Sequence, residues 1–135
     1  PNPIGIELDP LSRGLQNLSD IPRIQVSRLT ALLDAQGGGY TPDHVLREPT
    51  RDPVPNEAGN GLSNLRGTVG MARSQNPNSA NSQFFINFSD NHFLNGQYTV
   101  YGRVIEGMEH VDAIVRGEPP ANPDMMISVK VASDV

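Results

Sequence analysis

The chain has 135 residues and a mass of 14.6 kDa, which fits one domain with a hydrophobic core of its own. Its formal net charge is −5, and its nine Arg and single Lys, Lys130, lie scattered. This pattern excludes a basic surface for a phosphate backbone, so we expect no nucleic-acid partner. No apolar run approaches the ~20 residues of a membrane span, so we expect no transmembrane segment.

Turn-forming residues are frequent, with 13 Gly and 12 Pro in the chain. They indicate short elements joined by turns, and hence a mostly β fold. In chain order the sequence predicts a strand at 5–9, a long surface loop at 41–65, strands at 68–72, 83–88 and 99–105, a helix at 108–116 and a strand at 126–132.

Residues 26–35 (VSRLTALLDA) fit two structures. Leu29, Leu32 and Leu33 recur at helical spacing, and Ala, Leu and Arg are good helix formers. The same residues also fit a strand that precedes the Gln-Gly-Gly sequence at 36–38. The pattern alone leaves both readings open.

All four Phe of the chain fall within residues 79–96 (SANSQFFINFSDNHFLNG). Period-2 alternation along 83–88 places Phe84, Ile86 and Phe88 on one face of a strand and Gln83, Phe85 and Asn87 on the other. The first face is apolar and predicts core. The second combines amide groups with a ring, which is typical either of a buried strand or of a binding surface.

Several motifs in a fixed order resemble the cyclophilin family of peptidyl-prolyl isomerases. They are 36–40 (QGGGY), 56–62 (NEAGNGL), 67–73 (GTVGMAR), 78–86 (NSANSQFFI), 93–96 (FLNG) and 100–104 (VYGRV), and the first two resemble the family's bacterial branch. We therefore expect a single cyclophilin-like domain over 1–135, well matched over 36–135. The resemblance implies an antiparallel β-barrel with one or two short helices.

The first 35 residues depart from the family. Fewer residues separate the strand at 5–9 from the Gln-Gly-Gly sequence at 36–38 than in the family. We therefore expect a barrel that is incomplete or rearranged at its N-terminus. Aligned without a gap from Gln36, Arg28 falls on the family's catalytic arginine. In that alignment Leu33 replaces an aromatic residue of the proline slot and Asp34 replaces a Met, and no aromatic residue precedes Tyr40.

The resemblance implies an isomerase that binds proline-containing peptides or proteins and assists folding. Carried over residue by residue, the family pattern assigns catalysis to Arg28. Phe85 would floor the proline slot, Leu94 would be its wall, and Gln36 and Gln83 would donate hydrogen bonds. The same pattern assigns substrate binding to Ala72, Arg73, Phe93 and Tyr98.

A different class of function stays open beside this one: a catalytically inactive, cyclophilin-like structural subunit. Lost barrel strands leave unpaired backbone edges, which a protein partner would cover. We expect no cofactor and no metal, because His44, His92 and His110 lack acidic neighbours at the spacing of a metal site. The absence of cysteine favours a bacterial periplasm over the cytoplasm without deciding the compartment.

Overall fold

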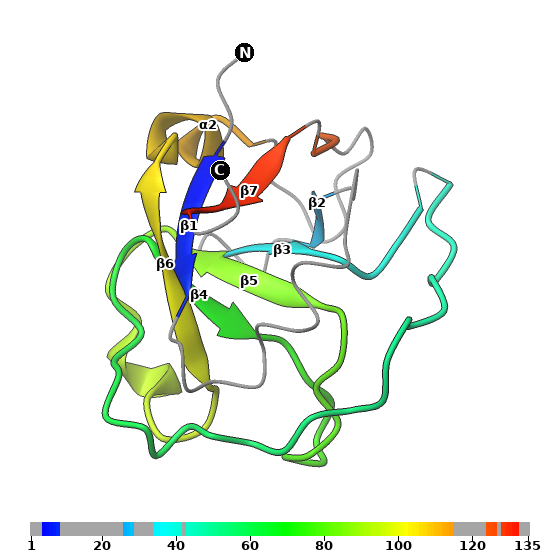
Figure 1. Cartoon of the computed structure of the whole chain (residues 1–135), viewed down its shortest axis with the longest axis vertical. Coiled ribbons are helices and arrows are strands. Elements are labelled where there is room, and N and C mark those ends of the chain that lie inside the picture. The colour runs from blue at the N-terminus through cyan, green and yellow to red at the C-terminus, as the bar shows by residue number, and fades with distance from the viewer. Residues whose placement is uncertain are drawn as a thin grey trace.

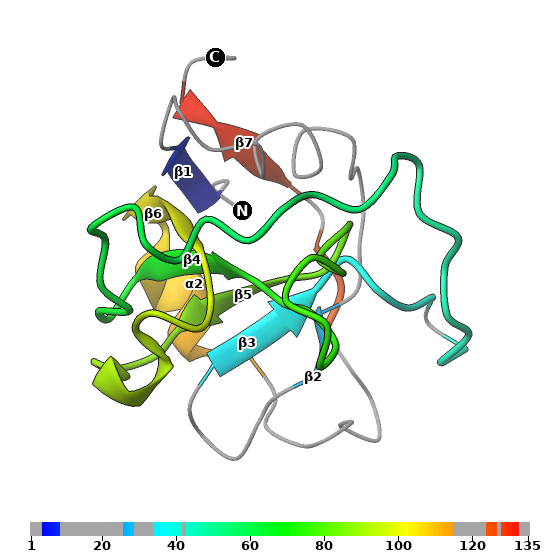
Figure 2. The same ribbon diagram turned by 90° about the horizontal axis from the view of Figure 1, so that it is seen from below.

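A computed structural model describes residues 4–8, 26–28, 34–41, 43–114, 124–126 and 128–132. Within these ranges the chain forms one curled sheet and one short α-helix, as Figures 1 and 2 show. The sheet has a half-barrel shape. The mostly β class that the sequence predicts is confirmed.

Seven strands of the described residues make up the sheet, in the order β2-β3-β5-β4-β6-β1-β7. Their bounds are β1 (Ile4–Leu8), β2 (Val26–Arg28), β3 (Asp34–Gly37), β4 (Thr68–Met71), β5 (Phe84–Asn87), β6 (Val100–Glu106) and β7 (Val129–Val131). Neighbouring strands pair antiparallel except β1 and β7, which are parallel. The predicted antiparallel sheet therefore carries one parallel pair at its end.

The segment that fitted both helix and strand forms strands where it is described. Residues 26–28 and 34–37 are β2 and β3, and their register pairs Arg28 with Gln36 and Val26 with Gly37. The helical reading is therefore wrong for these residues. The leucines whose spacing favoured a helix lie within residues 29–33, which are outside the described residues. Leu33, which the sequence placed in the proline slot, is one of them.

Strand β2 begins the sheet order and β7 ends it. The open edge that the sequence predicts would therefore lie at β2 or at β7. Residues 9–25 and 29–33 lie outside the described part of the chain, so a partner that covers the edge stays a prediction.

The core lies inside the curl of the sheet and follows the predicted alternation. Phe84, Ile86 and Phe88 of the β5 region are buried there with Val69 and Tyr101. The core also includes Ile6, Ala35, Met71, Ala80 and Val111. The burial of Tyr101 raises the pKa of its phenol, because the charged form would lose its hydration.

The α-helix α2 (Met108–Asp112) follows β6 and buries Val111 against the core. Gly107 precedes it at φ 86°, a left-handed conformation that suits glycine. The helix begins at the predicted residue but ends at Asp112, and residues 113–114 form a turn and a bend, so the predicted extent to Arg116 is too long. The loop at 41–65 runs along the outside of the sheet (Figure 2), as the sequence predicts.

Candidate functional site

A cleft of about 550 Å³ opens beside strands β3 and β5, between the loop that follows β3 and the 3-10 helix η1 (His92–Leu94). Its lining mixes apolar and polar groups. The lining residues are Asp34, Gln36, Leu46, Arg47, Pro49, Ala72, Arg73, Ser74, Ser79, Asn81, Ser82, Gln83, Phe85, Phe93, Leu94 and Tyr98. Such a mixed, concave surface is typical of a ligand site.

Phe85 provides the aromatic floor of the cleft, and Gly70 makes room for it. The two residues are paired in register across β4 and β5. A Cβ placed on Gly70 would lie 2.7 and 2.8 Å from the two Cε atoms of the Phe85 ring, and closer still to its Cζ. The ring therefore rests directly on the β4 backbone, where any other residue would displace it.

Gln83 provides amide groups next to that ring, over the backbone of a second glycine. A Cβ on Gly39 would lie 2.6 Å from the side-chain Cδ of Gln83. The preceding Gly38 has φ 87°, and its carbonyl accepts a hydrogen bond of 3.2 Å from the Ser82 hydroxyl. Two consecutive glycines thus let the backbone after β3 pack directly against the Gln83 side chain.

Phe93 and Leu94 reach the cleft from η1, which begins immediately after a buried asparagine. The Leu94 N–H donates to the Asn91 carbonyl at 3.0 Å, and the Tyr98 N–H donates to the Leu94 carbonyl at 3.1 Å. The Phe93 side chain is 58% exposed. An exposed ring at the rim of a cleft provides apolar contact area for an entering ligand.

A group of buried and partly buried amides, which we term the asparagine cluster, fixes η1 to the sheet. It consists of Asn64, Asn87, Asn91 and Asn95. The Asn91 side chain donates to Asn87 Oδ1 at 2.8 Å, and Asn87 donates to Asn64 Oδ1 at 3.2 Å and to Thr68 Oγ1 at 2.9 Å. The Asn64 N–H donates to Asn95 Oδ1 at 2.7 Å. Because Asn64 and Asn87 have no exposed surface, each lost bond would leave a buried polar group unpaired.

Arg73 and Tyr98 form the wall beside Phe85. The Arg73 guanidinium lies 4.7 Å from the centroid of the Tyr98 ring, a cation–π contact. The Tyr98 ring meets the Phe85 ring edge to face, with centroids 5.9 Å apart. Arg73 also donates to the Gln97 carbonyl through Nε at 3.1 Å and Nη2 at 2.9 Å. The guanidinium is therefore held in place next to the floor of the cleft.

A further wall of the cleft comes from the start of the loop at 41–65, which the sequence predicted only as a surface loop. A turn at 41–45, closed by the Thr41 N–H donating to the Val45 carbonyl at 2.9 Å, precedes Leu46 and Arg47. Both of these residues and Pro49 line the cleft. One sequence signal could have suggested this wall: the loop directly follows the motif that contains Gln36.

The structure brings together all eight residues that the sequence assigned to substrate binding. Gln36, Ala72, Arg73, Gln83, Phe85, Phe93, Leu94 and Tyr98 all line this cleft. Arg28 is described only by its backbone, which lies opposite Gln36. What these residues bind or catalyse stays a prediction.

Asp34, which replaces a Met of the family in the gapless alignment, also lines the cleft. Its residue is only 5% exposed, so little of the carboxylate faces the cleft. Burial of a charge is costly unless other groups compensate it, and Asp34 does interact with another group of the protein.

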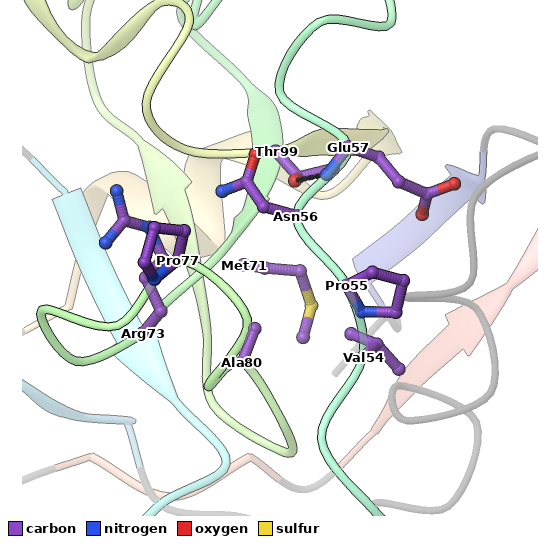
Figure 3. A pocket seen from close by; sticks show the side chains of 9 residues that line it. All are labelled: Val54, Pro55, Asn56, Glu57, Met71, Arg73, Pro77, Ala80 and Thr99. Carbon is purple, nitrogen blue, oxygen red and sulfur yellow. Dashed lines mark hydrogen bonds between the residues drawn. The ribbon is translucent and has the colours of Figure 1, made fainter.

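A second depression lies next to the cleft and shares Arg73 with it. Figure 3 shows Met71 between Arg73 and Pro77 on one side and Val54 and Pro55 on the other. Its volume is about 0 Å³, so it has no room for a water molecule. Within the described ranges, no three His, Asp or Glu side chains gather closely enough to hold a metal ion.

The sequence of this chain matches a known family over most of its length. The model of the cyclophilin type peptidyl-prolyl cis-trans isomerase family matches residues 23–133. The chain belongs to the cyclophilin family. This cyclophilin is 45% identical over 112 residues to a peptidyl-prolyl cis-trans isomerase of Acinetobacter baylyi, covering 73% of the chain and 59% of that relative.

Two further relatives are also bacterial. Peptidyl-prolyl cis-trans isomerase B of Escherichia coli is 49% identical over 87 residues, which cover 58% of this cyclophilin and 52% of the relative. A probable isomerase of Brucella abortus is 59% identical over 75 residues, covering 52% and 38%. The chain thus spans between about two fifths and three fifths of the length of these curated relatives.

Solved structures share the fold at lower sequence identity. The cyclophilin AquaCyp293 from Hirschia baltica superimposes with a TM-score of 0.79 at 22% identity, covering 96% of this chain and 70% of that one. A cyclophilin from Cryptosporidium parvum, solved in the presence of the dipeptide Ala-Pro, gives 0.70 at 22% identity, with 93% and 92% covered. These similarities confirm the cyclophilin-like fold. No helix within the described residues is long and apolar enough to cross a membrane.

Proposed function

We propose that this cyclophilin binds proline-containing peptide segments in the cleft and catalyses cis-trans isomerisation of their X-Pro bonds, assisting folding. The observation that carries the proposal is the meeting of an aromatic floor and amide side chains on one concave surface. Phe85 and Leu94 offer the apolar part, and Gln36 and Gln83 the polar part. The names of the bacterial relatives support the same activity.

The chemistry needs no covalent step and no cofactor. Rotation about a peptide bond faces a barrier of ~18–20 kcal/mol because amide resonance is lost on the way. A protein lowers this barrier when it binds the twisted bond more tightly than either planar form. It must therefore hold the proline ring, fix the neighbouring backbone and stabilise the prolyl nitrogen as that atom becomes pyramidal.

The cleft can meet the first two of these needs. The Phe85 ring, packed over Gly70 and only 2% exposed, forms the apolar base of the cleft, against which a proline ring would pack beside Leu94. The Gln83 amide, held over Gly39, supplies a donor and an acceptor for the peptide backbone beside it. Because the Phe85 ring is already packed in place before a peptide binds, little conformational entropy is lost there on binding.

We assign the third need to Arg28. A guanidinium is always charged and presents donors in a rigid fork, so it suits a hydrogen bond to a developing lone pair. Two observations support the assignment: the family resemblance, and the backbone register that pairs Arg28 with Gln36, a cleft residue. The removal of such a donor costs roughly 10²–10³ in rate.

Exchange spectroscopy by NMR on a peptide with one X-Pro bond tests the proposal directly. The chain should accelerate cis-trans exchange at substoichiometric concentration. Amide and side-chain signals of Gln36, Gln83 and Phe93 should shift on peptide addition, while those of the distant Glu109 should not. A folded chain that leaves the exchange rate unchanged would refute catalysis, and shifts confined to other surfaces would refute the cleft.

The inactive structural subunit remains the alternative. It predicts that a partner covers the sheet at β2 or β7, the two ends of the strand order. The relatives named above are all isomerases or probable isomerases, so the comparisons favour the enzyme.

A further inference from the structure

We propose that Arg73 makes this cleft selective for clients that carry a carboxylate, Asp or Glu, within two residues of the bound proline. The inference rests on the proposed function, because it takes the cleft as the proline-binding site. It adds a substrate class and a specificity-determining residue.

No carboxylate among the described residues pairs with the positive charge of Arg73. Its hydrogen bonds within the described residues all go to neutral backbone carbonyls. Besides the two bonds to Gln97, Nη1 donates to the Ser74 carbonyl at 2.9 Å and to the Gln75 carbonyl at 3.4 Å. A guanidinium has five N–H donors, and these four bonds leave at least one for a ligand.

The guanidinium is also fixed before any ligand arrives. The Tyr98 ring stacks against it at 4.7 Å, and the bonds to the Gln97 carbonyl prevent rotation about its last torsions. A flexible surface arginine must lose rotamer freedom when it pairs with a carboxylate, which cancels much of the gain. Arg73 has already lost that freedom on folding. A carboxylate that reaches it therefore gains more than one that pairs with a free side chain.

Arg73 lies close enough to the proline floor to contact a residue near the proline. Its guanidinium touches Tyr98, and Tyr98 touches Phe85, so one ring separates the charge from the floor. An extended peptide advances ~3.3 Å per residue. A Glu or Asp side chain one or two residues from the proline can span the remaining distance.

The other charges of the described lining do not favour a basic client. Arg47 is a second cation, and the sole carboxylate among these lining residues, Asp34, is only 5% exposed. The chain as a whole carries a formal charge of −5. Long-range attraction would therefore favour basic peptides. A preference for an acidic peptide would therefore show that its carboxylate contacts the cleft, because the net charge of the chain acts in the opposite direction.

A peptide series tests this selectivity. A neutral Ala-rich host with one proline receives Glu, Gln or Lys at each of the two positions before and after the proline. Affinity is measured by calorimetric titration and isomerisation by NMR exchange, at low salt and at about 0.5 M NaCl. At one or more positions, Glu should be favoured over Gln by about two- to five-fold, the range of a half-exposed charge pair. Lys should be disfavoured there, and salt should weaken the preference.

Three variants identify the group responsible. Arg73→Gln should bring the Glu to Gln ratio to about 1, because it keeps polar reach without charge. Arg73→Lys should retain part of the preference, since it keeps the charge without the fork. Lys130→Gln removes an equal charge from an exposed position on β7, outside the cleft lining, and should leave the ratio intact.

The inference fails if the ratio is 1 at every position in the wild type, if it survives Arg73→Gln, or if Lys130→Gln abolishes it equally. Absence of any peptide binding would also overturn it. Its failure is distinguishable from that of the proposed function. Isomerisation without a Glu preference would refute only the selectivity, whereas Arg73-dependent binding without isomerisation would refute only the catalysis.

Discussion

Gly70→Ala is the substitution that tests the geometry of the proline slot most sharply. The new methyl carbon would lie 2.7 and 2.8 Å from the Cε atoms of Phe85, far inside van der Waals contact. The other face of the Phe85 strand is packed against the core, so the strand cannot retreat without moving Phe84 and Ile86. The ring must therefore swing into the cleft, and we expect a loss of about 1–3 kcal/mol in the free energy of unfolding from overpacking.

The functional consequence should exceed the structural one. A ring displaced into the slot occupies the volume meant for proline, so affinity for a proline peptide should fall at least ten-fold while the chain stays folded. Gly59→Ala is the matched control, because a Cβ there meets nothing within 4 Å. Thermal melts and peptide titrations on both variants provide the measurement. Unchanged peptide affinity in a folded Gly70→Ala protein would contradict the placement of Phe85 as the floor.

Three further outcomes are expected. Phe84→Ala should lower the unfolding free energy by about 3–5 kcal/mol and leave the proline slot in place, whereas Phe85→Ala should mainly weaken peptide binding. Thermal melts and peptide titrations that show the reverse would mean that the two faces of the strand are exchanged. Gly39→Ala should displace Gln83 and lower kcat/KM, and a rate equal to wild type would show that this amide is not needed. Burial raises the pKa of Tyr101 in the folded state, so the stability that the buried phenol contributes is complete below its unfolded pKa of about 10 and falls as the pH rises above that value. Tyr101→Phe should therefore reduce the loss of unfolding free energy at alkaline pH, measured by urea titrations. An identical alkaline loss in the variant would refute this role of Tyr101.

The sequence predicted most of the sheet because its signals are local. Alternation along 83–88 assigned Phe84 to the core and Phe85 to the other face, and the structure places them in the core cluster and the cleft respectively. The strands at 68–72 and 99–105 were found within one or two residues of their observed bounds. Period-2 patterns depend only on which face is buried, so they are readable without knowing the partner strands.

The segment at 26–35 could not be settled in the same way. Its leucine spacing and helix-forming residues describe local preference, whereas the structure pairs Arg28 with Gln36 across two strands. Tertiary pairing overrides propensity in such short segments. The sequence alone gave no signal for the outcome except the resemblance to the family.

The rest of the cleft was missed because its residues are brought there by the fold. Leu46 and Arg47 sit in a loop whose sequence shows only turns and prolines. The asparagine cluster is likewise invisible in the sequence, since Asn64 and Asn87 are 23 positions apart and meet only when β5 forms beside the loop. Asparagines in loops are ordinarily read as turn formers, and nothing local shows that these two are fully buried.

The measurement that tests the central claim most directly is the isomerisation rate of a single X-Pro peptide with wild type, Arg28→Ala and Arg28→Lys, each shown to be folded by its melting curve. The account predicts acceleration by the wild type and a fall in kcat/KM of roughly 10²–10³ for Arg28→Ala. Arg28→Lys should recover only part of the loss, since a lysine lacks the rigid fork. A folded wild type without acceleration, or a rate that Arg28→Ala leaves unchanged, would contradict it.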